Sequence, residues 1–188
     1  MRYLALAFAI IVLGCSKGPG SGRSIVVAPS TRPAFTLDAS KPFVIELGRG
    51  SGLYGLDTVK LTEDGTVELH RIKSFRPNLE TTSLKLLPGQ LKELIDLVNS
   101  NHITGMGASY SDPGIMDGTQ WVLWIKQTPF EKAIYFNNAF PGEITDFASR
   151  LDAVLAAAGL SGASWTAVPE KEGTAQQMAI WDKIKSGK

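Results

Sequence analysis

Alternating apolar and polar positions predict two β-hairpins in the middle of the chain. Segments 56–63 and 66–73 each place valine and leucine side chains on one face, and an Asp-Gly pair lies between the two segments. That pair is among the strongest short-range signals for a tight hairpin turn. Segments 120–127 and 131–137 flank a Thr-Pro pair and predict a second hairpin. A further β-rich run, residues 42–49, precedes the first hairpin.

A period of 3.6 residues replaces this alternation in three other segments. Segments 87–101 and 143–160 each carry an apolar stripe with the spacing of an amphipathic helix. Segment 174–185 begins with Thr174 and Gln177, the pattern of a capping box, and predicts a short final helix. We expect this final helix to cover the second face of the sheet.

The order of these elements is typical of an α+β fold. We expect a single domain, residues 42–160, in which an antiparallel sheet built from two hairpins carries two amphipathic helices packed on one face. Residues 161–188 form a C-terminal tail with the short helix. Residues 16–41 are rich in Gly, Pro, Ser and Thr, a composition typical of a flexible linker. Within this linker, Ile25-Val26-Val27 is a candidate edge strand.

The amino terminus has the pattern of a secretory signal peptide. Arg2 is followed by an uncharged apolar run of 11 residues, too few for a membrane-spanning helix. The run ends in Val12-Leu13-Gly14-Cys15, which resembles the lipobox of bacterial lipoproteins. The resemblance implies that residues 1–14 are removed and that Cys15 is lipidated with diacylglycerol and palmitate-like acyl chains. An ordinary signal peptide with an incidental cysteine, or a soluble chain with an apolar end, are the alternatives.

Charge and cysteine content narrow the set of partners. Loss of residues 1–14 leaves 18 basic against 18 acidic residues with no basic stripe, so nucleic acid is not an expected partner. Cys15 is the only cysteine, so the chain cannot form an internal disulfide. Ser16 and Lys17 follow it in place of aspartate, which in the lipoprotein pattern implies the outer membrane, facing the periplasm of a bacterial cell envelope.

Few residues offer catalytic chemistry. His70 lies on the polar face of a predicted strand, and His102 closes a predicted helix, where a cation meets the negative end of the helix dipole. His102, Asp112 and Asp117 could together bind a divalent cation, but their spacing matches no established ligand pattern and both aspartates stand in turn sequences. The chain has no G-x-S-x-G elbow and no H-E-x-x-H motif. We therefore expect no catalytic residue, no metal, no cofactor and no enzymatic activity.

Segment 44–61, VIELGRGSGLYGLDTVKL, resembles the opening motif of the emfourin family. Emfourins are small bacterial inhibitors of thermolysin-like metalloproteases with the pattern R-S-G-G-F-A-G near their start. The present chain has its Gly-Ser pair in reversed order and a tyrosine in place of a small residue. Over about residues 42–158, the resemblance implies an α+β fold and a partner-binding corner made of Arg49, Ser51, Gly52, Leu53, Tyr54 and Gly55.

Together these patterns predict a lipid-anchored envelope protein with a non-catalytic, protein-binding domain. The resemblance implies a protease as the partner class. Two alternatives stay open: an envelope hydrolase that uses the long loop 101–118, and a structural lipoprotein with no dedicated ligand.

Overall fold

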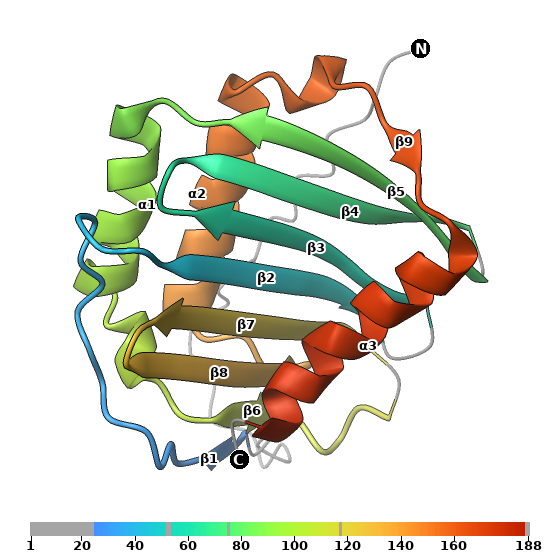
Figure 1. The fold of residues 1–188 in the computed structure, drawn as a ribbon. Coiled ribbons are helices and arrows are strands. Elements are labelled where there is room, and N and C mark those ends of the chain that lie inside the picture. The colour runs from blue at the N-terminus through green and yellow to red at the C-terminus, as the bar shows by residue number, and fades with distance from the viewer. Residues whose placement is uncertain (1–24, 52–53, 75, 117, 187–188) are drawn as a thin grey trace, which may run out of the picture.

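The described part of the chain, residues 25–51, 54–74, 76–116 and 118–186 of a computed structural model, folds into one sheet of nine strands between two helical layers (Figure 1). The predicted signal peptide and Cys15 lie outside these residues, as do Gly52, Leu53 and Asp117. In chain order the elements are β1 (Val26–Ala28), β2 (Val44–Ser51), β3 (Gly55–Thr62), β4 (Thr66–Ser74), β5 (Arg76–Lys85), α1 (Pro88–Ser100), the 3₁₀ helix η1 (Ile103–Gly105), β6 (Ser109–Ser111), β7 (Gln120–Gln127), β8 (Phe130–Asn137), α2 (Gly142–Ala157), the 3₁₀ helix η2 (Leu160–Gly162), β9 (Thr166–Ala167) and α3 (Glu170–Ser186).

The sheet corrects the expected architecture. Its strand order is β1-β6-β8-β7-β2-β3-β4-β5-β9, and β6 runs parallel to β8. An antiparallel sheet built from two hairpins is therefore wrong: the sheet is mixed, and strands outside both hairpins extend it on either side. The physical reason lies in β6, which is three residues long and polar, so it has no apolar alternation to signal a strand.

Both predicted hairpins form. In the β3–β4 hairpin, Val59 pairs with Leu69 and Leu61 with Val67, so the apolar face continues across the turn. Gly65 of that turn has a φ of +80°, which the Asp-Gly signal anticipates. The β7–β8 hairpin turns through a cis Thr-Pro peptide.

Helices α1 and α2 lie side by side on one face of the sheet, as predicted (Figure 1). Leu94, Ile95 and Val98 are the buried residues of α1, and α2 buries the stripe that includes Phe147 and Leu151. These side chains pack against alternating strand residues and form the larger of two hydrophobic clusters. The periodicity of each helix therefore identified the correct buried face.

Helix α3 crosses the second face of the sheet diagonally (Figure 1). It buries Ile180 and Ile184 against Leu56 and Val122, which form a smaller second cluster. The expected cover of this face is confirmed, but the capping-box interpretation is wrong. The helix begins at Glu170, four residues before the threonine of that pattern, so Thr174 lies inside the helix and is exposed.

The second half of the expected linker lies against the body of the domain. β1 pairs with β6 at the edge of the sheet, as Ile25-Val26-Val27 suggested. Further along, Leu37 is buried, its backbone N–H donates to Asn99 Oδ1 over 2.8 Å, and Asn99 Nδ2 donates back to the Leu37 carbonyl over 3.0 Å. Composition alone missed this packing because one buried leucine and reciprocal side-chain bonds hold the segment, and neither leaves a periodic pattern.

Candidate binding surface

The corner between β2 and β3 is a tightly closed hairpin end. Gly50 pairs with Leu56 and Ser51 with Gly55. A Cβ atom on Gly50 would lie 2.1 Å from the Gly55 carbonyl oxygen, and Gly55 has a φ of +90°, so larger residues do not fit at these two positions. Two glycines of the emfourin-like motif are therefore needed to close the hairpin.

Helix α3 braces this corner from outside. The Gln177 side chain accepts a hydrogen bond from the Leu56 backbone N–H at 2.9 Å and donates to the Leu56 carbonyl at 2.7 Å. Its carboxamide thus pairs with the backbone of β3 as a neighbouring strand would. On β2, a Cβ atom at Gly48 would come within 2.6 Å of Ile180 Cδ1, so the bare backbone there lets α3 approach closely.

Arg49, predicted to bind a partner, faces α2 instead of the solvent. Its guanidinium donates two hydrogen bonds to the Asp152 carboxylate, at 2.6 and 2.7 Å, a bidentate pair. The guanidinium also lies 5.9 Å from the centre of the Trp121 ring. This arrangement ties the corner to α2 and engages Arg49 within the domain.

Tyr54 is the exposed aromatic residue of the corner, with 60% of its surface accessible. Its backbone N–H donates to the hydroxyl of Ser51 at 3.1 Å. Next to it is an open hollow of about 430 Å³ lined by Arg49, Gly50, Ser51, Tyr54, Gly55, Asp57, Ile72 and Lys73. An exposed aromatic ring beside a hollow suits docking of another protein, because tyrosine is enriched among the residues that dominate protein interfaces. Arg49, Ser51, Tyr54 and Gly55 of the predicted site thus come together here.

Asp57 lies at the rim of the same hollow. Burial raises the pKa of its carboxyl, against the backbone hydrogen bond from Ile72 and the nearby Arg49 and Arg71 guanidinium groups, which lower it. The Asp57 carboxylate accepts the Ile72 N–H at 2.7 Å and so fastens β3 to β4 at the corner.

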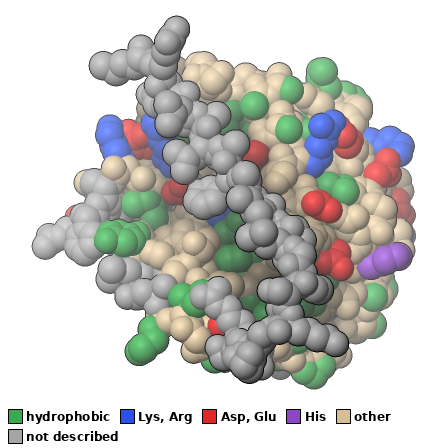
Figure 2. Space-filling view, turned by 180° about the vertical axis from the view of Figure 1, so that it is seen from behind, with side chains coloured by type: hydrophobic (Ala, Val, Ile, Leu, Met, Phe, Trp, Pro, Cys, Tyr) green, Lys and Arg blue, Asp and Glu red, His purple; other side chains and the backbone are tan. Residues whose placement is uncertain are grey.

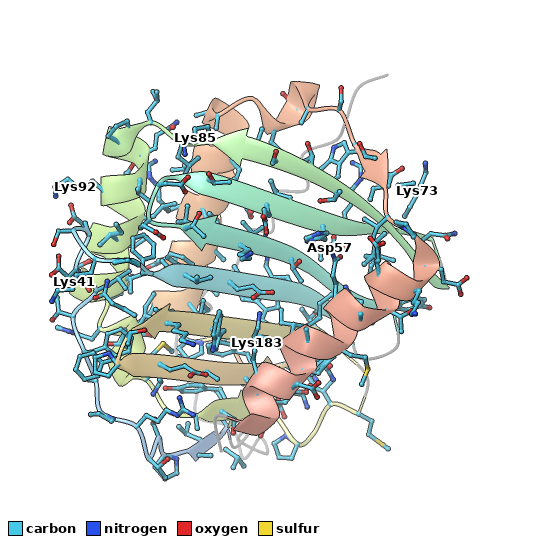
Figure 3. All side chains as sticks on the ribbon, in the orientation of Figure 1. Lys41, Asp57, Lys73, Lys85, Lys92 and Lys183 are labelled. Carbon is cyan, nitrogen blue, oxygen red and sulfur yellow. The ribbon has the colours of Figure 1, made fainter. Side chains whose placement is uncertain are left out.

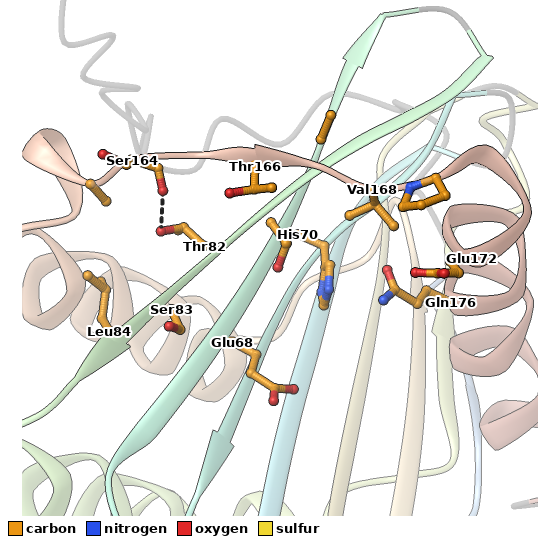
Figure 4. A pocket seen from close by; sticks show the side chains of 14 residues that line it. Glu68, His70, Thr82, Ser83, Leu84, Ser164, Thr166, Val168, Glu172 and Gln176 are labelled. Atoms are coloured by element: carbon orange, nitrogen blue, oxygen red, sulfur yellow. Dashed lines mark hydrogen bonds between the residues drawn. The ribbon is translucent and has the colours of Figure 1, made fainter.

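A second and larger hollow, of about 760 Å³, lies between β4, β5, β9 and the first turns of α3 (Figure 4). Its lining is mostly polar and includes Glu68, His70, Glu172 and Gln176, whose side chains point into it in Figure 4. Burial lowers the pKa of the His70 imidazole, and the Glu68 and Glu46 carboxylates oppose that effect. His70 thus lies on the face of β4 that the sequence marks as polar, but it is only partly exposed there.

His70 is held in this groove by Thr58 of the neighbouring strand. The Thr58 hydroxyl and His70 Nδ1 share a hydrogen bond of 3.3 Å. Glu68 is engaged by Lys60 at 2.8 Å. The groove has polar walls that suit contact with a polar ligand or peptide. Periodicity could not reveal it because one of its walls is formed by β9, a strand of two residues.

The metal site considered from the sequence does not assemble in the described residues. His102 follows α1 in a left-handed conformation with a φ of +51°, and Asp112 follows β6, where its carboxylate accepts the Gly114 N–H at 2.9 Å. Asp117 lies outside the described residues. Within the described ranges, no group of three or more His, Cys, Asp or Glu side chains is arranged to hold a metal ion.

The charged surface is made of short ion pairs. Lys73 pairs with Glu80 at 2.7 Å and Lys85 with Asp64 at 2.8 Å, and Lys41, Lys92 and Lys183 each contact a carboxylate as well (Figure 3). On the opposite side of the molecule, acidic and basic side chains again lie next to each other where the surface is visible (Figure 2). The pairs of Lys41, Lys85 and Lys92 are exposed on both sides and contribute about 0–1 kcal/mol each. Glu80 and Glu46, the partners of Lys73 and Lys183, are each only 8% exposed.

In the part of the chain that the structure describes, no helix is long and apolar enough to cross a membrane. No protein-family model matches the chain, and no curated protein is significantly similar to it.

Proposed function

We propose that this protein is a lipid-anchored component of a bacterial envelope whose folded domain binds another protein through the β2–β3 corner. The observation that carries the proposal is Tyr54, which is 60% exposed next to a hairpin end where Gly50 and Gly55 pack closely and Gln177 bonds to Leu56. Exposed tyrosines on rigid supports are typical of the residues that dominate protein interfaces.

The anchor rests on the amino-terminal sequence. An uncharged apolar run leads directly to Cys15, the lone cysteine, and two or more acyl chains there would hold the protein stably at a lipid surface. The residues after Cys15 support an address on the outer membrane, facing the periplasm. In this proposal residues 1–14 are absent from the mature protein.

The partner class comes from the resemblance of segment 44–61 to the emfourin motif. We propose a thermolysin-like metalloprotease, into whose cleft the tip of the corner would insert. The corner fits this task because α3 and α2 brace it from two sides, through Gln177 and through the Arg49–Asp152 pair. An inhibitor loop benefits from such bracing because a rigid loop binds without a large ordering cost.

The test is inhibition of a thermolysin-like protease by the full-length purified protein. We expect inhibition that Tyr54→Ala weakens at least about tenfold, since tyrosine anchors are commonly worth more than about 1.4 kcal/mol. Met178→Ala on α3 is the matched control, because Met178 is 51% exposed and lies outside the corner. If wild type and Tyr54→Ala inhibit the protease equally well, or if neither inhibits it, the corner is not the inhibitory site.

A photo-crosslinking amino acid at position 54 tests partner binding independently of the partner class. In cells, we expect one specific protein adduct from position 54 and none from position 178. The same adducts from both positions would show random contact and contradict the proposed surface.

A further inference from the structure

Among the described residues, the edge of the sheet formed by β1 carries exposed apolar side chains and pairs with no further strand. Ile25, Val26 and Val27 are 58%, 53% and 50% exposed, and β1 is the last strand on its side of the sheet. An edge strand with exposed apolar side chains promotes association unless something covers it. The edge strands of natural sheets more often carry charged side chains. We therefore expect another surface to cover this apolar edge.

β1 is joined to the sheet only through β6 among the described strands. Val26 pairs with Ser111, the last residue of β6, and Val27 pairs with Tyr110. The backbone N–H of Asp112 donates to the Asn137 carbonyl, so the loop after β6 starts beside the end of β8. The apolar edge is thus made of Ile25, Val26 and Val27, at the start of β1.

We infer that this edge rests on the lipid surface to which the protein is anchored. The inference rests on the lipidation proposed above for Cys15. Ten peptide units join Cys15 to Ile25, a reach of about 35 Å when fully extended and roughly 17 Å as a Gly-rich coil. Nine strands spaced about 4.8 Å apart place β9 roughly 40 Å from β1, so the tether brings the β1 edge to the membrane first.

The charge of the tether is complementary to an anionic lipid surface. Residues 16–24 contain Lys17 and Arg23 and no acidic residue. Basic residues next to a membrane are attracted to anionic headgroups, and this attraction would draw the start of β1 towards the interface. Half-exposed valine and isoleucine side chains at that point would then enter the boundary between headgroups and acyl chains.

A second copy of the chain is a weaker occupant. Pairing of two β1 strands would engage three residues of each chain, whereas a stable protein interface engages roughly 20–30 residues a side. A lipid surface needs no such area because the covalent anchor already supplies the affinity. Contact at the edge then sets the orientation of the domain.

The test uses the full-length lipidated protein on vesicles of phosphatidylethanolamine and phosphatidylglycerol. Because acylation consumes the thiol of Cys15, Val26→Cys and Ile25→Cys can each be labelled with an environment-sensitive fluorophore. Met178→Cys, with almost the same exposure on α3, is the control. We expect emission at positions 25 and 26 to rise at least about twofold on vesicles and to be quenched by headgroup spin labels, with no change at 178.

The possible outcomes distinguish a failure of the edge inference from a failure of the proposed lipid anchor. If the protein floats with the vesicles but the emission at positions 25 and 26 changes no more than at position 178, the edge inference is overturned. The proposed anchor is unaffected by that result. If emission at 26 rises with protein concentration in the absence of vesicles, the occupant is a second copy, and the inference is again overturned. If mass spectrometry finds Cys15 without lipid and the protein does not float, the proposed anchor fails and the edge inference fails with it.

Discussion

At the scale of single residues, Lys132 is the most unusual side chain of the domain. It belongs to β8, is 1% exposed, and its ammonium group donates a hydrogen bond to the carbonyl of Met106. Burial lowers its pKa from 10.5 to about 8, and the nearby Arg32 acts in the same direction. The strand pattern could not single it out, because a lysine in an alternating strand is expected on the solvent face.

The pH dependence of stability should reveal Lys132. Between pH 8 and 10.5 the unfolded chain binds a proton that the folded chain has released, so the free energy of unfolding rises with pH by about 3 kcal/mol from this residue. Below pH 8 Lys132 is charged in the folded protein as well, so the full cost of burying its charge lowers the free energy of unfolding. Lys132→Met should remove the rise, as measured by urea unfolding at intervals from pH 7 to 10.5.

Lys126 provides the control for this experiment. It is exposed on the neighbouring strand β7, so Lys126→Met should leave the slope of stability against pH as it is in the wild type. If Lys132→Met and wild type keep parallel curves from pH 8 to 10.5, the lysine is charged in the folded protein and the predicted shift of its pKa is wrong.

At the scale of elements, prediction succeeded where a segment buries one continuous face. The two hairpins and helices α1 and α2 have such faces, so a period of two or 3.6 residues marked them. Strands β5, β6 and β9 were missed for a shared reason. β5 is rich in polar residues, and the other two are only three and two residues long, so non-local pairing decides their structure.

The candidate site was predictable in part. The glycines and Tyr54 could be selected from sequence, since a run of glycines between two strands marks a tight corner. The roles of Arg49 and Gln177 could not, because their partners Asp152 and Leu56 lie 103 and 121 residues away along the chain. Only the folded arrangement shows that both residues brace the corner.

Docking of α3 should depend on Gln177. Replacing it by leucine keeps the volume but removes both hydrogen bonds to Leu56, leaving a backbone donor and an acceptor without this partner. We expect Gln177→Leu to lower the free energy of unfolding by about 2 kcal/mol, measured by urea denaturation. Gln176→Leu is the control, since Gln176 is exposed on the same helix and should change stability little. Equal losses in both variants would contradict a specific role of Gln177.

At the scale of the whole molecule, the sheet separates two hydrophobic clusters of unequal size. Among the described residues, 24 buried side chains join the sheet to α1 and α2, and four form the cluster beneath α3. The strands contribute to both clusters, so the sheet cannot persist without the larger one. The smaller cluster, by contrast, can open while the rest of the fold stays intact.

Native-state hydrogen exchange should therefore show two levels of protection. Helix α3 buries Ile180 and Ile184, at about 1.5–3 kcal/mol each, whereas α2 buries six side chains, so α3 amides should exchange through undocking at a free energy below that of global unfolding. Their exchange should also depend more weakly on added denaturant than that of α2 amides, since undocking exposes less surface. Gln177→Leu should accelerate exchange in α3 more than in α2. If α2 and α3 amides instead share one exchange free energy and one denaturant dependence, the two helical layers unfold together. In that case α3 braces the β2–β3 corner as firmly as the main core does.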